Sequence, residues 1–140
     1  MKSPIYSCLW FDGNAKAAAD FYLTVFRNSK IIAENPILVM IEINERKFML
    51  LNGGPQYKPT EANSLVIECE TQDDIDHYWN KLTEDGEESM CGWLKDKFGY
   101  SWQVVPSMLG SLMSDPVKGP RVVQAFLKMK KFNIQVLLDA

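Results

Sequence analysis

Few residues of this 140-residue chain carry a reactive group in a pattern that points to catalysis. His77 is the only histidine, and Cys8, Cys69 and Cys91 lack the Cys-x-x-Cys spacing typical of a metal site. An odd number of thiols without that spacing predicts small apolar side chains in a reduced, cytoplasmic protein. No G-x-G sequence occurs anywhere, which argues against a doubly wound fold that binds a dinucleotide-type cofactor.

Composition narrows the class of protein further. The formal net charge is −3, the pI is near 5.2, and no basic footprint for nucleic acid is present. No run of 18 apolar residues occurs, so we expect no membrane segment, and the start MKSPIYS lacks the apolar core of a secretory signal. The length suits a single domain, 1–140, large enough to bury a core.

The elements that must position any site begin with a strand and an amphipathic helix. Apolar residues over 5–11 predict a strand, and a polar turn follows, in which Asn14 is the expected N-cap of a helix that reaches Phe26. Three further strands are expected, at 29–34, 37–43 and 47–51. The first unit is therefore a βαβββ module over about residues 4–57.

The same order of elements begins again after a polar linker. A strand at 64–69 leads through the expected N-cap Thr71 into a helix that ends near Glu84. Weak strand signal at 87–90 and 92–95, a turn at 96–99 and a strong strand at 101–105 complete a second module over about 62–107. The tail, 108–140, predicts short helices, with Pro120 in the first turn of one of them and the last element, 132–138, either helix or strand.

This repeat predicts an α+β fold in which two βαβββ modules form a curved mixed sheet around a cleft, with helices at the C-terminus. Four stretches are characteristic: Leu9–Tyr22, Phe48–Pro55, Ile67–Leu82 and Cys91–Pro106. On these stretches the chain resembles the vicinal oxygen chelate superfamily, which has the glyoxalase/bleomycin-resistance fold and includes extradiol dioxygenases. Within it the chain resembles the PhnB-like branch, which carries the label 3-demethylubiquinone-9 3-methyltransferase. Because no G-x-G loop is present, we read that label as a name and not as an activity.

The resemblance also implies where a metal would bind. Metal-dependent members take ligands, typically histidine and glutamate, from the first and last strands of each module. The matching positions here are Tyr6, Met49, Ser64 and Gln103. None of these four side chains is a good ligand for a divalent ion, so we expect no metal at these positions and no other cofactor. A divalent metal at unorthodox positions is the alternative.

Strand alternation then assigns residues to the cleft. If Tyr6 faces the cleft, Ile5, Leu9 and Phe11 pack under the first helix, and the same reasoning applies to Ser64 and Gln103. The predicted ligand-binding residues are Tyr6, Cys8, Trp10, Met49, Leu51, Ser64, Glu68, Trp93 and Gln103. The two tryptophans could equally fill core space, and Gln103 could serve only neighbouring backbone or linker groups.

Three functions fit these expectations. The first is binding of a small, partly aromatic metabolite without the usual metal site. The second is a lyase, isomerase or dioxygenase that uses a metal at other positions or Glu68 as general base; Cys8 is a weaker candidate nucleophile, because no histidine on the cleft strands could activate it. The third is a non-catalytic module that dimerises through its apolar tail. The resemblance and the tail together predict a homodimer, unless the tail only covers a sheet of its own chain.

Overall fold

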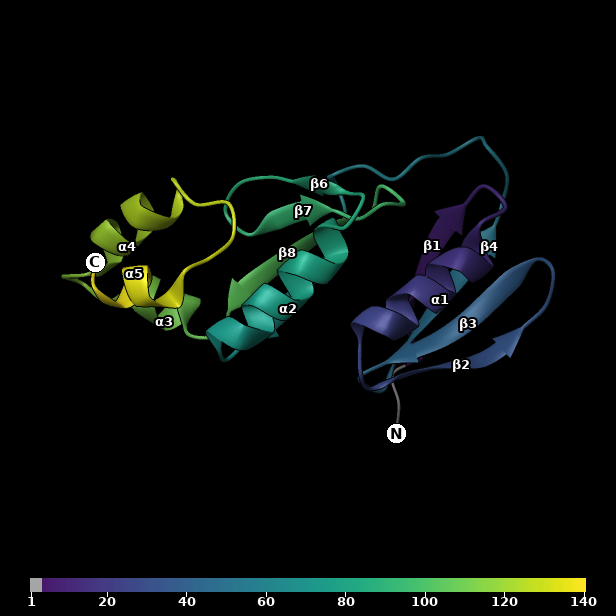
Figure 1. Cartoon of the computed structure of the whole chain (residues 1–140), viewed down its shortest axis with the longest axis horizontal. Coiled ribbons are helices and arrows are strands. Elements are labelled where there is room, and N and C mark those ends of the chain that lie inside the picture. Colours follow the sequence, from purple (N-terminus) through teal and green to yellow (C-terminus); the bar gives the residue numbers. More distant parts are fainter. Residues whose placement is uncertain (1–3) are drawn as a thin grey trace. The chain divides into compact units, whose positions relative to one another are not determined.

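The computed structural model describes residues 4–140, and Figure 1 traces their elements along the chain. The chain divides into two compact units, Met1–Pro59 and Thr60–Ala140, and each is described by itself. Each unit contains the expected helix and a four-stranded sheet, so the α+β fold with doubled βαβββ order is confirmed. Whether the units form a single domain stays a prediction.

Unit 1 contains one helix and four strands. They are β1 (Ser7–Phe11), α1 (Ala15–Val25), β2 (Ser29–Glu34), β3 (Leu38–Ile43) and β4 (Arg46–Asn52). The strand order is β1-β4-β3-β2, with β1 parallel to β4 and the other neighbours antiparallel. The β3–β4 hairpin turns through Asn44 and Glu45, both at positive φ, as a two-residue hairpin loop requires.

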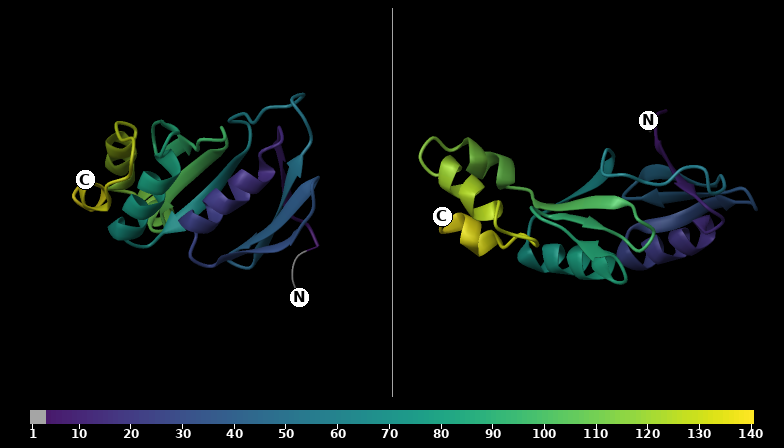
Figure 2. Two further views of the ribbon diagram at one scale, coloured as in Figure 1. Left: turned by 45° about the vertical axis from the view of Figure 1, so that its right-hand side comes forward. Right: turned by 90° about the horizontal axis from the view of Figure 1, so that it is seen from above.

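α1 packs on one face of this sheet, as Figure 2 shows. Leu9, Phe11 and Leu50 are buried on that face, together with alternate residues of β3. Ile5, which the alternation placed under the helix, is instead 83% exposed, because it precedes β1. That part of the register prediction is wrong.

The cap of α1 also differs from the prediction. Asn14 occupies the N-cap position but its side chain makes no cap hydrogen bond. The backbone N–H of Ala15 donates instead to Asn52 Oδ1, at 2.9 Å, from the end of β4. A long-range side chain therefore satisfies an orphan amide that we expected a local one to satisfy.

Unit 2 repeats the order and adds three helices. Its elements are β5 (Ser64–Cys69), α2 (Gln72–Thr83), β6 (Glu87–Glu88), β7 (Trp93–Lys95), β8 (Ser101–Pro106), α3 (Leu109–Ser114), α4 (Gly119–Phe126) and α5 (Ile134–Leu138). The strand order is β5-β8-β7-β6, with β5 parallel to β8. α2 covers one face of this sheet through Ile75, Trp79 and Leu82. Thr71 caps it as predicted, because the Thr71 side chain accepts from the backbone N–H of Asp74.

A buried carboxylate organises the predicted turn at 96–99. Asp96 is only 2% exposed. Its Oδ1 accepts from the backbone N–H groups of Phe98 and Tyr100, and its Oδ2 accepts from Trp102 Nε1 at 2.9 Å. The turn and the first half of β8 are thus held by one side chain.

The helical tail packs partly on its own unit. Residues 129–132 run beside the β6–β7 connection, where the backbone N–H of Cys91 donates to the carbonyl of Met129, and Phe132 lies against Gly92. A side chain at position 92 would overlap the Phe132 ring, so glycine is required there.

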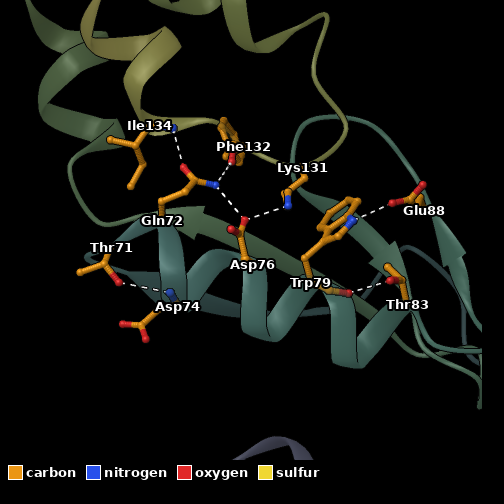
Figure 3. A network of polar contacts seen from close by, with 10 residues as sticks. All are labelled: Thr71, Gln72, Asp74, Asp76, Trp79, Thr83, Glu88, Lys131, Phe132 and Ile134. Carbon is orange, nitrogen blue, oxygen red and sulfur yellow. Dashed lines mark hydrogen bonds and ion pairs between the residues drawn. The ribbon is translucent and has the colours of Figure 1, made fainter.

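Figure 3 shows a second attachment of the tail, through Gln72 of α2. Gln72 donates to the carbonyl of Phe132 and accepts from the backbone N–H of Ile134, while Lys131 pairs with Asp76 at 2.8 Å. These contacts attach the tail to α2 and to the β6–β7 connection of its own unit, and packing of the tail on a second subunit stays a prediction. Other apolar side chains of the tail stay exposed: Met113, Val117, Leu127, Val136 and Leu138.

Candidate functional site

Each sheet has a face opposite its helix, which we call the far face. In unit 1 the ladder places Cys8 beside Met49 and Met49 beside Met40, and the next row joins Trp10, Leu51 and Leu38. Cys8 is exposed and the other members of these rows are half-buried. The far face of unit 1 is therefore a largely apolar surface with sulfur-bearing side chains at its centre.

Trp10 is fixed at the end of this face by its own unit. Its Nε1 donates to the Gly54 carbonyl at 2.9 Å, and its ring meets Tyr57 edge-on, with 4.9 Å between centroids. Any side chain at position 53 would overlap the Trp10 ring, so Gly53 allows the loop to cross it closely. Trp10 therefore has a packing role within unit 1. Its ring is only half-buried, so it also borders the far face, where a ligand could contact it.

The other two candidate residues of the first strand, Tyr6 and Cys8, are exposed but only in part. Tyr6 is 43% exposed and lies before β1, and Lys47 Nζ sits 5.6 Å from the centre of its ring. Partial burial raises the pKa of the Cys8 thiol above its ordinary value. A raised pKa lowers the thiolate fraction at neutral pH, which makes Cys8 a poor nucleophile.

In unit 2 two of the predicted residues contact each other. Gln103 Nε2 donates to Ser64 Oγ at 3.0 Å, across the parallel β5–β8 pair. Trp93 lies beside Gln103 in the β7–β8 ladder and is half-buried. The far face of unit 2 therefore combines an aromatic ring with an amide–hydroxyl pair.

The remaining candidates for chemistry lie apart from this pair. Glu68, opposite Val105, is exposed. His77 lies on α2, its ring edge-on to Tyr78 at 5.0 Å. Burial, with a smaller contribution from the charge of Asp74, raises the pKa of Cys69 to about 11, so that thiol is unreactive. Within residues 4–140 no three histidine, cysteine, aspartate or glutamate side chains are grouped so as to hold a metal ion.

A pocket of about 550 Å³ adjoins the far face of unit 2, beside β6 and β7. Trp93, Lys95 and Ser101 line it, and Lys95 Nζ pairs with Glu61 at 2.9 Å. The hydrogen bond from Lys95 lowers the pKa of Glu61 and raises that of Lys95, although both side chains are substantially exposed.

Sequence reasoning missed several residues of these faces. Leu38 and Met40 follow from the alternation in β3, but the alternation was applied only to the first and last strands of each module. Lys95 and Glu61 were missed because the β6–β7 signal was too weak to fix a register, and Glu61 lies in a stretch read only as linker. The expected cleft between the modules stays a prediction.

Comparison with known proteins decides the family. Residues 3–105 match the family model described as 3-demethylubiquinone-9 3-methyltransferase. The chain belongs to this family. No curated protein sequence matches it significantly.

Solved structures place the family fold within the glyoxalase/bleomycin-resistance group. A putative 3-demethylubiquinone-9 3-methyltransferase, PhnB protein, from Bacillus cereus is 29% identical, with a TM-score of 0.69, covering 75% of this chain and 100% of that one. Lactoylglutathione lyase from Agrobacterium tumefaciens is 16% identical, with a TM-score of 0.52, over 77% and 96% of the two chains. The fosfomycin resistance protein FosX from Listeria monocytogenes, solved with Mn(II) and sulfate, is 12% identical, with a TM-score of 0.55, over 74% and 89%. The last two share the fold, and the resemblance to the PhnB-like branch is confirmed.

The residues at the usual ligand positions do not fit a divalent metal in this member of the family. Tyr6 and Met49 offer a phenol and a thioether, and Ser64 and Gln103 offer a hydroxyl and an amide that already bond to each other. Divalent ions of this class prefer imidazole, thiolate or carboxylate groups.

Proposed function

We propose that this protein binds a small, partly aromatic metabolite on the far faces of its sheets, without a metal at the usual positions of the superfamily. The observation that carries the proposal is the hydrogen bond between Ser64 and Gln103. At two positions where the resemblance to the superfamily implies metal ligands, this chain has a neutral polar pair, with Trp93 beside Gln103. Such a pair suits recognition of a neutral or polar ligand group next to an apolar ring.

The alternative is an enzyme of the same superfamily, a lyase, isomerase or dioxygenase. It would need a base or nucleophile near the ligand, and the candidates are Glu68 and Cys8. Glu68 is exposed, and the raised pKa of Cys8 disfavours its thiolate. These properties favour binding over catalysis. The free thiols of Cys8, Cys69 and Cys91 support a reducing, cytoplasmic setting as part of the same proposal.

Ligand titration with tryptophan fluorescence tests the proposal. A planar aromatic ligand should change the emission, and Trp10→Ala should weaken binding by about 1–3 kcal/mol, or about tenfold to hundredfold. Because Trp10 also packs on Gly53, Trp10→Phe serves as the control that keeps a ring. Gln103→Ala should cost about 1 kcal/mol, as expected for one neutral hydrogen bond.

Two further measurements separate binding from catalysis. Glu68→Gln should leave affinity unchanged, whereas an enzyme that uses Glu68 as base would lose turnover while it keeps its affinity. Elemental analysis after dialysis should find no stoichiometric transition metal. The metal-free proposal would be overturned if the protein retained one equivalent of a transition metal after dialysis and lost it when far-face residues are replaced.

A further inference from the structure

The pocket beside β6 and β7 carries a feature that the fold alone does not explain. Ser101, which lines it, is only 2% exposed, and its Oγ has no hydrogen-bond partner within residues 4–140. A buried hydroxyl without a partner destabilises the folded state, so such groups are rare in native proteins. This Oγ is almost closed off from solvent, so a ligand group in the pocket would supply the missing partner once a neighbouring side chain moves aside.

The charges that line the pocket restrict the class of ligand. Two carboxylates, those of Glu61 and Glu87, lie beside one ammonium, that of Lys95, which leaves a surplus of one negative charge. Glu88 also lines the pocket, but its carboxylate accepts from Trp79 Nε1 of α2 at 2.7 Å (Figure 3) and is not counted. Glu61 pairs with Lys95 directly, and Glu87 lies opposite Lys95 in the β6–β7 ladder. An anion would meet net repulsion here, whereas a cation would be attracted.

The aromatic side chain of the pocket favours the same class. Trp93 lines the pocket and is half-buried. The face of an indole ring attracts cations, and it also stacks on flat apolar groups. One ring can therefore hold either part of a ligand that joins an apolar body to a positive charge.

We propose that this pocket binds an organic cation, a protonated amine on a short apolar or aromatic body, whose N–H group donates to Ser101 Oγ. The inference rests on the proposed function, because Trp93 belongs to both sites. It adds the charge of the ligand and a specific polar contact in unit 2.

Three probes with one ring and different charges test the sign of the charge. Phenethylamine is a cation at pH 7, 3-phenylpropionate an anion and 2-phenylethanol neutral. Calorimetric titration of the full chain should show phenethylamine binding at least about tenfold more tightly than either of the others, with affinity falling as salt is added. Equal binding of the amine and the alcohol would overturn the inference and leave the proposed function standing. No binding of the amine at about 10 mM would overturn the inference as well.

Charge-changing variants should act in opposite directions. Glu87→Gln should weaken phenethylamine binding about fivefold, whereas Lys95→Gln should tighten it by a similar factor, because each changes the surplus of negative charge by one unit. Glu84→Gln removes an exposed carboxylate that does not line the pocket, and it should leave binding unchanged. Two results together would assign the pocket to anions and overturn the inference. These are weaker amine binding in Lys95→Gln, and tighter binding of 3-phenylpropionate than of phenethylamine by the unaltered protein.

Ser101→Ala separates a ligand contact from a purely structural role. Removing an unpaired buried hydroxyl should raise the melting temperature, and it should weaken phenethylamine binding about tenfold, as expected for a lost hydrogen bond to a charged group. Ser111→Ala, at an exposed position of α3, is the matched control. Unchanged amine affinity in Ser101→Ala would overturn the contact. A second outcome separates the two proposals. If Ser101→Ala weakens amine binding but Trp10→Ala does not change the affinity for aromatic ligands, the proposed binding on the far face of unit 1 is wrong and the inference for unit 2 stands.

Discussion

Replacing Gln72 by alanine should detach the C-terminal tail from α2. The Gln72 side chain accepts from the backbone N–H of Ile134 at 2.8 Å, and its Nε2 donates to the carbonyl of Phe132 at 2.9 Å and to Asp76 at 3.0 Å. Alanine keeps helix propensity but removes all three bonds. Two backbone groups of the tail then lose their partner.

The expected loss of stability follows from the number and exposure of these bonds. Each of the two bonds to backbone groups contributes about 0.5–1.5 kcal/mol, and the bond to the charged Asp76 carboxylate contributes somewhat more. Because the position is half-buried, water replaces part of this, and we expect a loss of about 2 kcal/mol. For a chain of 140 residues this lowers the melting temperature by about 7 °C if unfolding is two-state. If the tail opens alone, its amides should exchange about 30-fold faster.

Hydrogen exchange resolved by residue is the assay that locates the effect. Faster exchange should be confined to about residues 129–138, with the Ile134 amide changing most. Gln135→Ala is the matched control, because the Gln135 side chain is exposed and, among residues 4–140, bonds only to Asp139. Unchanged protection of the Ile134 amide, or an equal effect of Gln135→Ala, would refute this account of how the tail is held.

Three further predictions concern the cap of α1, an acid-sensitive contact and the assembly. Asn52→Ala should destabilise unit 1 by about 1 kcal/mol in thermal unfolding, and Asn14→Ala should change it less, because Asn52 supplies the cap. The hydrogen bond from Lys131 holds the pKa of Asp76 below its ordinary 3.8, so its stabilising contribution is present above pH 3.8 and is lost as pH falls through the lower folded value. The difference in unfolding free energy between Asp76→Asn and the unaltered protein should therefore vanish in strong acid. Light scattering at micromolar concentration should give the dimer mass that the sequence predicts, and removal of tail 108–140 should abolish it. A monomer mass for the full chain would contradict the predicted homodimer.

Periodicity was enough to predict the helices, most strands and the faces of each sheet. Leu9, Phe11 and Trp102 are buried under the helices as alternation required, since one face of each strand must pack against its helix. The alternation failed at Ile5 because it carries no information on where a strand begins. The alternation also could not assign the faces of β6, because its two residues are too few to show a period.

Long-range partners are what the sequence pattern could not supply. Asn52 caps a helix whose first residue lies 37 positions earlier, and nothing local marks Asn52 for that role. Gly53 and Trp10 are likewise 43 positions apart, and their contact is visible only when β1 lies beside β4. The unpaired Ser101 hydroxyl belongs to the same group, because burial of a particular atom depends on all neighbouring elements.

The buried carboxylate of Asp96 has a consequence for how the turn at 96–99 tolerates change. One side chain serves three donors, and the indole N–H of Trp102 occupies one of its oxygens. Asparagine would present an NH₂ group to at least one of these donors, and glutamate would move the acceptors by a methylene. Random mutagenesis should therefore accept many residues at the neighbouring exposed Lys97 and very few at Asp96. A side chain without a donor at position 102 would remove one of these three hydrogen bonds from a buried carboxylate, so Trp102 should accept few residues as well.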